Sequence, residues 1–256
     1  MVEVNGSKHP ALVMELMQGG SLHEFLHCRT ALSPPLTPQA QHQIGMDVAV
    51  GLQYLHSLGW MHRDIKPRNV LLDGAAPLRA KLSDFGLSTR IGVEGKLSGA
   101  GTFKYMAPEA YFQAFSPPAD IYSFGILLWE LIYAEQPFWD YTNLRLHRKR
   151  VALMVAVAAD NVRPRLRGGP LEAPCGYAGL ARACWETDGA KRPEIATVVA
   201  MLQKLQGSPI GPPQVRDNRA YGAAVSPDSS ALSAGTPWET ISHHTAKVAG
   251  PPLTAV

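Results

Sequence analysis

The chain has 256 residues, of which 46% are hydrophobic and 18% charged, and its 24 basic and 21 acidic side chains give a net charge of +3. This length predicts one or two domains with enough apolar residues for a buried core. A charge this small argues against nucleic acid or an anionic membrane as a partner. Three cysteines, at 28, 175 and 184, are too few for a disulfide scaffold and match no zinc-binding spacing, which favours reduced thiols in a cytoplasmic protein.

The composition changes near residue 206. Residues 207–256 contain many Pro, Ser, Ala and Gly and no periodic apolar pattern, so we expect a disordered tail. Residues 1–206 are expected to form the globular domain. The longest apolar stretch, residues 121–134, is interrupted by Ser123 and Glu130 and is too short and polar to cross a membrane. No signal peptide is expected at the N-terminus.

The first predicted elements are a hairpin and a short helix. Residues 2–4 and 11–16 are β-prone runs on either side of the Asn-Gly dipeptide at 5–6, which predicts a β-hairpin. Ser21 is expected to cap a short helix over residues 22–27.

A long amphipathic helix is predicted next, because Thr37 is a capping residue and Pro38 suits the first helical position. Its apolar residues recur every three or four positions, and it is expected to end at Gly59. Two short strands should follow, over residues 69–72 and 80–83. The remaining predicted elements are helices over residues 107–113, 119–133, 142–159, 177–185 and 194–205.

Three motifs indicate chemistry. Residues 62–69 are His-Arg-Asp-Ile-Lys-Pro-Arg-Asn, residues 84–86 are Asp-Phe-Gly and residues 107–109 are Ala-Pro-Glu. In this order they resemble the eukaryotic protein kinases. Six fixed positions of the first motif would match by chance with a probability of ~10⁻⁸, so the signal is specific. The resemblance implies an α+β fold, namely a mostly helical kinase large lobe with a residual N-terminal β-hairpin.

The catalytic roles are those that the resemblance implies. Phosphoryl transfer requires an oriented hydroxyl, magnesium-bound phosphates and charge stabilisation. Asp64 would be the base that orients the substrate hydroxyl. Lys66 would steady the transferred phosphate and mark a serine/threonine rather than a tyrosine kinase. Asn69 and Asp84 would bind Mg²⁺, and the alternative for all four is a solvated polar loop.

ATP would lie against the end of the hairpin segment, by the same resemblance. Glu15 and Met17 would offer backbone groups to adenine, and Leu71 would form the floor beneath it. Met14 occupies the gatekeeper position. For Met14 and Leu71 the alternative is plain core packing.

Several structural roles follow from the resemblance. His62 and Phe85 would be stacked parts of an internal spine, and Asp120 would anchor the backbone of the catalytic loop. Glu109 and Arg192 would form a structural ion pair. Among the hydroxyls after the Asp-Phe-Gly motif, the interpretation favours Thr89 or Ser98 as a phosphorylation switch and Thr102 as a contact to the catalytic loop. Residues 101–109 and 122–131 look most like the tyrosine-kinase-like group of serine/threonine kinases.

The ATP-positioning elements of the family are not found in the sequence. There is no G-x-G-x-x-G, and Lys81, in an Ala-Lys dipeptide, comes after the catalytic loop, where it cannot be the strand lysine. We therefore expect most of the small lobe to be lost or to lie outside this chain. The cleft face should then expose Leu71, Phe85 and the apolar side of the hairpin.

Two functions stay open. One is an ATP- and Mg²⁺-dependent kinase acting on Ser/Thr of a protein substrate, with little activity in this chain alone. The other is a non-catalytic kinase-like module that binds a protein partner through the exposed cleft face. A basic cluster at residues 145–150 is interpreted as a solvated helical face, with a docking surface or a nuclear signal as alternatives.

Overall fold

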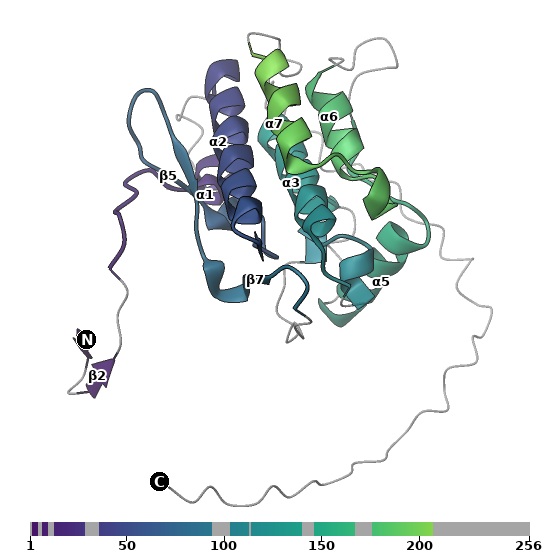
Figure 1. Cartoon of the computed structure of the whole chain (residues 1–256), viewed down its shortest axis with the longest axis horizontal. Helices are drawn as coiled ribbons and strands as arrows, with labels where there is room; N and C mark the ends of the chain where they lie inside the picture. The colour runs from purple at the N-terminus through teal and green to yellow at the C-terminus, as the bar shows by residue number, and fades with distance from the viewer. Residues whose placement is uncertain are drawn as a thin grey trace, which may run out of the picture. The chain divides into compact units, whose positions relative to one another are not determined.

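The computed structural model describes residues 2–4, 7–9, 13–28, 36–93, 103–112, 114–139, 146–166 and 176–206 (Figure 1). The predicted tail over residues 207–256 lies outside the described residues. No helix in the described part of the chain is long and apolar enough to span a membrane.

The predicted hairpin is present, but its second strand lies nearer to the first in the sequence than expected. Strand β1 (Val2–Val4) pairs antiparallel with β2 (Ser7–His9), with Val4 opposite Ser7. The second strand is residues 7–9, with residue 7 directly opposite residue 4, so the strand predicted over residues 11–16 is wrong for its described part, residues 13–16. Pro10, which follows β2 in the sequence, has no N–H for a ladder. Residues 13–17 lie in no strand.

A small three-stranded sheet includes the strand that leads into the first helix. Strand β3 (Gly20–Ser21) pairs with β5 (Val70–Leu72), which pairs with β6 (Ala80–Leu82), all antiparallel. Strands β5 and β6 are those expected from the sequence, whereas β3 was not expected. Ser21 also caps α1 (Leu22–His27): its Oγ accepts from the Glu24 N–H at 3.2 Å, and the Glu24 carboxylate accepts from the Ser21 N–H at 2.8 Å.

The helices form most of the domain. Helix α2 (Pro38–Ser57) begins at the predicted Thr37 cap and packs against α7 (Ile195–Lys204). Helix α3 (Pro117–Tyr133) is buried over most of its length and packs against α6 (Tyr177–Cys184) and α2. Figure 1 shows these four helices grouped together, with α5 (Leu146–Ala158) beyond the end of α3. The core is a single cluster that these helices share with β5 and α1.

Two details differ from the predicted elements. The helix expected over residues 107–113 is a single 3₁₀ turn, η4 (Glu109–Phe112), in which Ala110 and Tyr111 donate to carbonyls three residues back. Strands β4 (Trp60–Met61) and β7 (Thr89–Arg90), which pair antiparallel, were not expected, because two residues carry no periodic pattern. The predicted catalytic loop, residues 62–69, begins directly after β4.

Candidate active site

Asp120 holds the start of the catalytic loop, as expected. From the first turn of α3, its buried carboxylate accepts the His62 N–H at Oδ2 and the Arg63 N–H at Oδ1, both at 2.8 Å. Arg63 has a φ of 68°, a strained value that these bonds help to maintain. The Arg63 guanidinium lies 4.3 Å from the ring centroid of Phe115. Sequence reasoning missed His56, whose Nε2 donates to Asp120 Oδ2 at 2.9 Å; no motif marks this residue.

The structure brings Asp64, Lys66 and Asn69 together. Lys66 Nζ lies 2.5 Å from Asp64 Oδ2, and both side chains are largely buried. The Asn69 amide N–H donates to the Asp64 carbonyl and to Asp64 Oδ2, each at 2.9 Å. Asn69 lies at the end of the 3₁₀ turn η1 (Pro67–Asn69). One carboxylate oxygen therefore accepts from both neighbours, which fixes the rotamer of Asp64.

His62 is held in one tautomer. The Asp64 N–H can only donate, so His62 Nδ1 accepts it at 3.3 Å, and Nε2–H donates to the Ser83 carbonyl at 3.1 Å. Burial lowers the pKa of His62, so its neutral form is favoured. Its ring lies 5.2 Å from that of Phe85 at an angle of 51°, so the predicted pair is in contact but tilted rather than stacked.

Asp84 is held near the catalytic loop by hydrogen bonds of the residue before it. The preceding residue, Ser83, donates from N–H and Oγ to the Asn69 carbonyl, at 2.9 and 3.1 Å. Asp84 has a left-handed backbone, with φ 62° and ψ 71°, and its exposed carboxylate accepts the Gly86 N–H at 3.3 Å. The 3₁₀ turn η2 (Phe85–Leu87) follows it.

The predicted adenine-binding residues lie around β5 and β6. Leu71 is half-buried in β5, opposite Lys81 of β6, and Lys81 Nζ forms an ion pair with Glu15 at 2.5 Å. The Met17 carbonyl accepts the Gly20 N–H at 3.3 Å, in a turn. Glu15 and Leu71 are therefore both neighbours of Lys81. No described hydrogen bond or ion pair joins Glu15 or Met17 to Asp64 and its neighbours.

Apolar side chains are exposed beside this region. Val13, Met14 and Leu16 are 93%, 67% and 80% exposed, and Phe85 is 53% exposed. Core packing, the alternative considered for Met14, is therefore wrong. The side chains of the hairpin, which were expected on the same face, lie outside the described residues.

The candidate phosphorylation sites are only partly described. Ser88 Oγ donates to the His62 carbonyl at 3.4 Å, and Thr89 pairs with Met61 in the β4–β7 ladder. Ser98 and Thr102 lie outside the described residues.

The expected ion pair is formed. Arg192 donates to the two oxygens of Glu109 at 2.6 and 2.9 Å, and its side chain is fully buried. It also donates to the carbonyls of Glu186, Thr187 and Pro118. This fork ties the Ala-Pro-Glu segment to the loop before α7.

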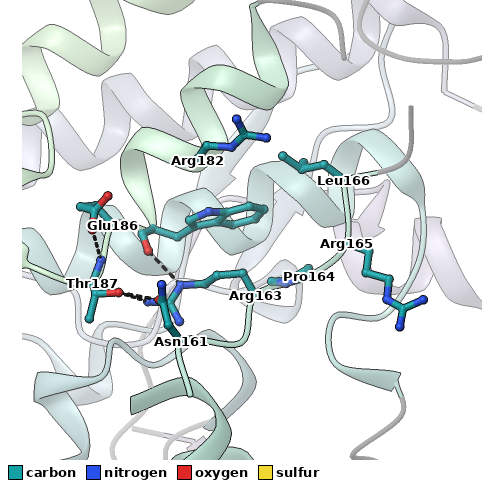
Figure 2. A pocket seen from close by; sticks show the side chains of 9 residues that line it. Asn161, Arg163, Pro164, Arg165, Leu166, Arg182, Glu186 and Thr187 are labelled. Carbon is teal, nitrogen blue, oxygen red and sulfur yellow. Dashed lines mark hydrogen bonds between the residues drawn. The ribbon is translucent and has the colours of Figure 1, made fainter. Parts of the chain in front are cut away.

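The larger of two described cavities, about 600 Å³, is lined by none of the site residues predicted from the sequence (Figure 2). Arg163 forms part of its wall and is fully engaged in the fold, because it donates to the carbonyls of Trp185 and Val157 and to Thr187 Oγ1. The guanidinium groups of Arg165 and Arg182 point away from each other in Figure 2. We therefore place the candidate active site at the catalytic loop and not in this cavity.

Comparison with known proteins agrees with the geometry. Residues 2–202 match the family model for protein tyrosine and serine/threonine kinases. The chain is 36% identical over 197 residues to serine/threonine/tyrosine-protein kinase HT1 of Arabidopsis thaliana, covering 75% of this chain and 46% of the relative. It is 34% identical over 207 residues to ephrin type-A receptor 8 of Rattus norvegicus, covering 77% and 51%. For serine/threonine-protein kinase STY17 of Arabidopsis thaliana, the identity is 32% over 202 residues, covering 78% and 33%.

The chain thus spans about half, or less, of the length of these relatives. The family match covers well over half of this chain, and it includes the loop in which Asp64, Lys66 and Asn69 converge. The chain belongs to the protein kinase family.

Proposed function

We propose that this chain is the catalytic-loop-bearing part of a protein kinase that transfers the γ-phosphate of ATP to Ser or Thr hydroxyls of a protein substrate. The observation that carries the proposal is the convergence of Lys66 and Asn69 on one oxygen of Asp64. Asp64 Oδ1 accepts no hydrogen bond from the described residues, so it is the atom we assign to the substrate hydroxyl.

The residues around Asp64 suit Mg²⁺. Asn69 donates from its amide nitrogen to Asp64, so its amide oxygen is left for a cation. Asp84 offers an exposed carboxylate directly after Ser83, which donates to the Asn69 carbonyl. Carboxylate and amide oxygens are the donors that this hard cation prefers. When bound, Mg²⁺ would neutralise the charge that develops on the phosphates. The protein's own part is to hold Asn69 and Asp84 near each other through the hydrogen bonds of Ser83 to the Asn69 carbonyl.

Lys66 supports the choice of Ser/Thr. Its ammonium group is held 2.5 Å from Asp64, where a transferred phosphoryl group would meet it. The matching family model covers tyrosine kinases as well, and one relative is named a serine/threonine/tyrosine-protein kinase, so the substrate hydroxyl has to be decided by experiment.

The chain alone is expected to bind ATP weakly. Positioning contributes much of the rate in phosphoryl transfer. The 256 residues contain no G-x-G-x-x-G. Of the residues expected near ATP on the side of the sheet, the structure describes Glu15 and Leu71, both neighbours of Lys81.

The exposed Val13, Met14 and Leu16 favour a second candidate, a non-catalytic module that binds a protein partner through this apolar face.

Nucleotide binding is tested by thermal unfolding of the purified chain with Mg-ATP. A millimolar site at ~5 mM ligand adds about 1 kcal/mol and raises Tm by roughly 2–4 °C. The shift should disappear in Asp84→Asn and persist in Lys191→Met, a substitution at an exposed lysine outside the site. Absence of a shift in the wild type would favour the binding module.

Phosphate transfer is tested separately with γ-labelled ATP and matched Ser, Thr and Tyr peptides. We expect low turnover on Ser or Thr that Asp64→Asn abolishes, with Tyr left unlabelled. Labelling of Tyr instead would overturn the Ser/Thr assignment. Labelling that survives Asp64→Asn would overturn the role of Asp64.

A further inference from the structure

Two histidines and a buried carboxylate meet between α1 and α3. His23 and His27 lie one turn apart on the same side of α1, with ring centroids 5.0 Å apart. Glu130 of α3 is fully buried, and its Oε1 lies 2.6 Å from His27 Nε2. One nitrogen of each histidine and one oxygen of Glu130 lie within 4.8 Å of one another. The proposed kinase chemistry uses none of these residues.

The buried carboxylate is held in place from its other side. Tyr105 donates its hydroxyl to Glu130 Oε2 at 2.6 Å, and burial raises the pKa of Tyr105 well above its usual value, so the hydroxyl stays a donor. An outer hydrogen bond of this kind orients a carboxylate ligand in metal sites. Oε1 is thereby directed toward the histidines.

Each histidine has a ring nitrogen whose present hydrogen bond a cation would replace. His23 Nε2 accepts from the Arg68 guanidinium at 2.9 Å, and Arg68 is exposed, so it can move into solvent when a cation takes that lone pair. His27 Nε2 donates its N–H to the Glu130 carboxylate, so a cation binds at this nitrogen after the proton of the ring moves to Nδ1.

We propose that His23, His27 and Glu130 form a binding site for Zn²⁺ or a similar borderline cation. Two imidazoles and one carboxylate are a ligand set of zinc sites that keep a fourth position for water. With Zn–N and Zn–O bonds of about 2.1 Å at a tetrahedral angle, ligand atoms lie about 3.4 Å apart. The His27–Glu130 separation therefore has to widen by less than 1 Å, and the bound ion would link α1 to α3.

Two cations oppose binding. Arg68 touches His23, and the Lys104 charge also lowers the pKa of His23. The repulsion between these cations and a bound ion weakens the site. Arg68, which a bound ion would displace, precedes Asn69 in η1. Mg²⁺ and Ca²⁺ should not bind here, because these hard cations require oxygen ligands. The choice between Zn²⁺ and Mg²⁺ therefore distinguishes this site from the oxygen ligands that Asp84 and Asn69 offer.

The test is titration of the full-length, EDTA-treated chain carrying Cys28→Ser and Cys175→Ser, which removes competing thiols; Cys184 is buried. Zn²⁺ at ten times its dissociation constant should raise Tm by about 3–6 °C with one equivalent bound. Co²⁺ should give the visible d–d bands of a four- or five-coordinate complex. Mg²⁺ should do neither.

Variants decide the location of the ion. His23→Asn should weaken Zn²⁺ binding at least ~10-fold, a loss typical of damage to a metal site. It should do so with an unchanged far-UV spectrum, because His23 is only half-buried. His42→Gln, at a histidine bonded to Tyr177 outside the cluster, and Asp84→Asn should both bind as the parent does. Unchanged affinity in His23→Asn, or its loss in Asp84→Asn, would overturn the proposal, as would no Zn²⁺ binding to the parent chain.

Discussion

Three consecutive backbone N–H groups of the catalytic loop, those of residues 62, 63 and 64, each donate to a side chain. Asp120 accepts the first two of these N–H groups, and the His62 ring accepts the third and donates to the Ser83 carbonyl. A buried donor left unmatched costs about 1–3 kcal/mol, so this pattern specifies the loop conformation. The same bonds hold Asp64 in place.

Stability should depend on pH through His62. Its pKa is lowered in the folded state, so the unfolded chain takes up the proton first as pH falls below about 6.5. The free energy of unfolding should therefore be constant above that pH and decrease below it, by at most about 1.4 kcal/mol per pH unit for one group. Urea unfolding between pH 8 and pH 5 measures this slope.

His62→Gln is the matched variant, because glutamine offers one acceptor and one donor without titrating. It should reduce the slope below pH 6.5, and the remainder should come from His23 and His42, whose pKa values burial also lowers. Equal slopes in the variant and the wild type would show that His62 does not couple protonation to unfolding.

At the scale of elements, the contact between α3 and α6 depends on a missing side chain. A Cβ on Gly125 would lie 2.7 Å from Cys184 Cβ and 3.1 Å from the Ala181 carbonyl. Backbone on one side and a packed thiol on the other leave no room to adjust. The two helices can pack at this distance only with glycine there.

A pair of glycine substitutions tests this packing. Gly125→Ala should lower the free energy of unfolding by about 1–3 kcal/mol through overpacking. Gly179→Ala, in α6 with open space around its Cβ, should instead raise it by about 0.5–1 kcal/mol through helix propensity. Both are measured by urea unfolding. Destabilisation of similar size in both variants would refute the packing argument.

At the scale of the domain, Arg192 and Glu109 join segments 83 residues apart. The guanidinium also binds three carbonyls, so the loop before α7, the start of α3 and the Ala-Pro-Glu segment share one cation. A planar fork is required for this set of bonds, which lysine cannot provide.

Arg192→Met should therefore cost about 3 kcal/mol or more, because the pair loses its buried cation. Arg192→Lys should cost a similar amount, because lysine keeps the charge but cannot form the fork. Lys191→Met is the control, since its 3.9 Å pair with Asp188 is exposed and should contribute nothing measurable. Differential scanning calorimetry compares the three. Full stability in Arg192→Lys would show that charge alone, rather than the fork, holds these segments.

Motif spacing predicted the parts of the site that form within one loop or through a family pattern. Asp64, Lys66 and Asn69 lie within six residues, so their meeting follows from the loop itself. Three-dimensional neighbours without a motif could not be predicted. His27 and Glu130 are 103 positions apart, and only the packing of α1 on the core brings them together. Two-residue strands such as β3 and β4 have no period to detect.

The rate at which a thiol reagent labels Cys184 reports on the opening of the α3–α6 contact. Its thiol is buried against Gly125, and burial raises its pKa to about 12, so almost no thiolate forms at neutral pH. A thiol reagent can modify it only when the two helices separate, whereas the exposed Cys28 reacts at once. The ratio of the two labelling rates therefore reports how often this part of the large lobe opens under native conditions.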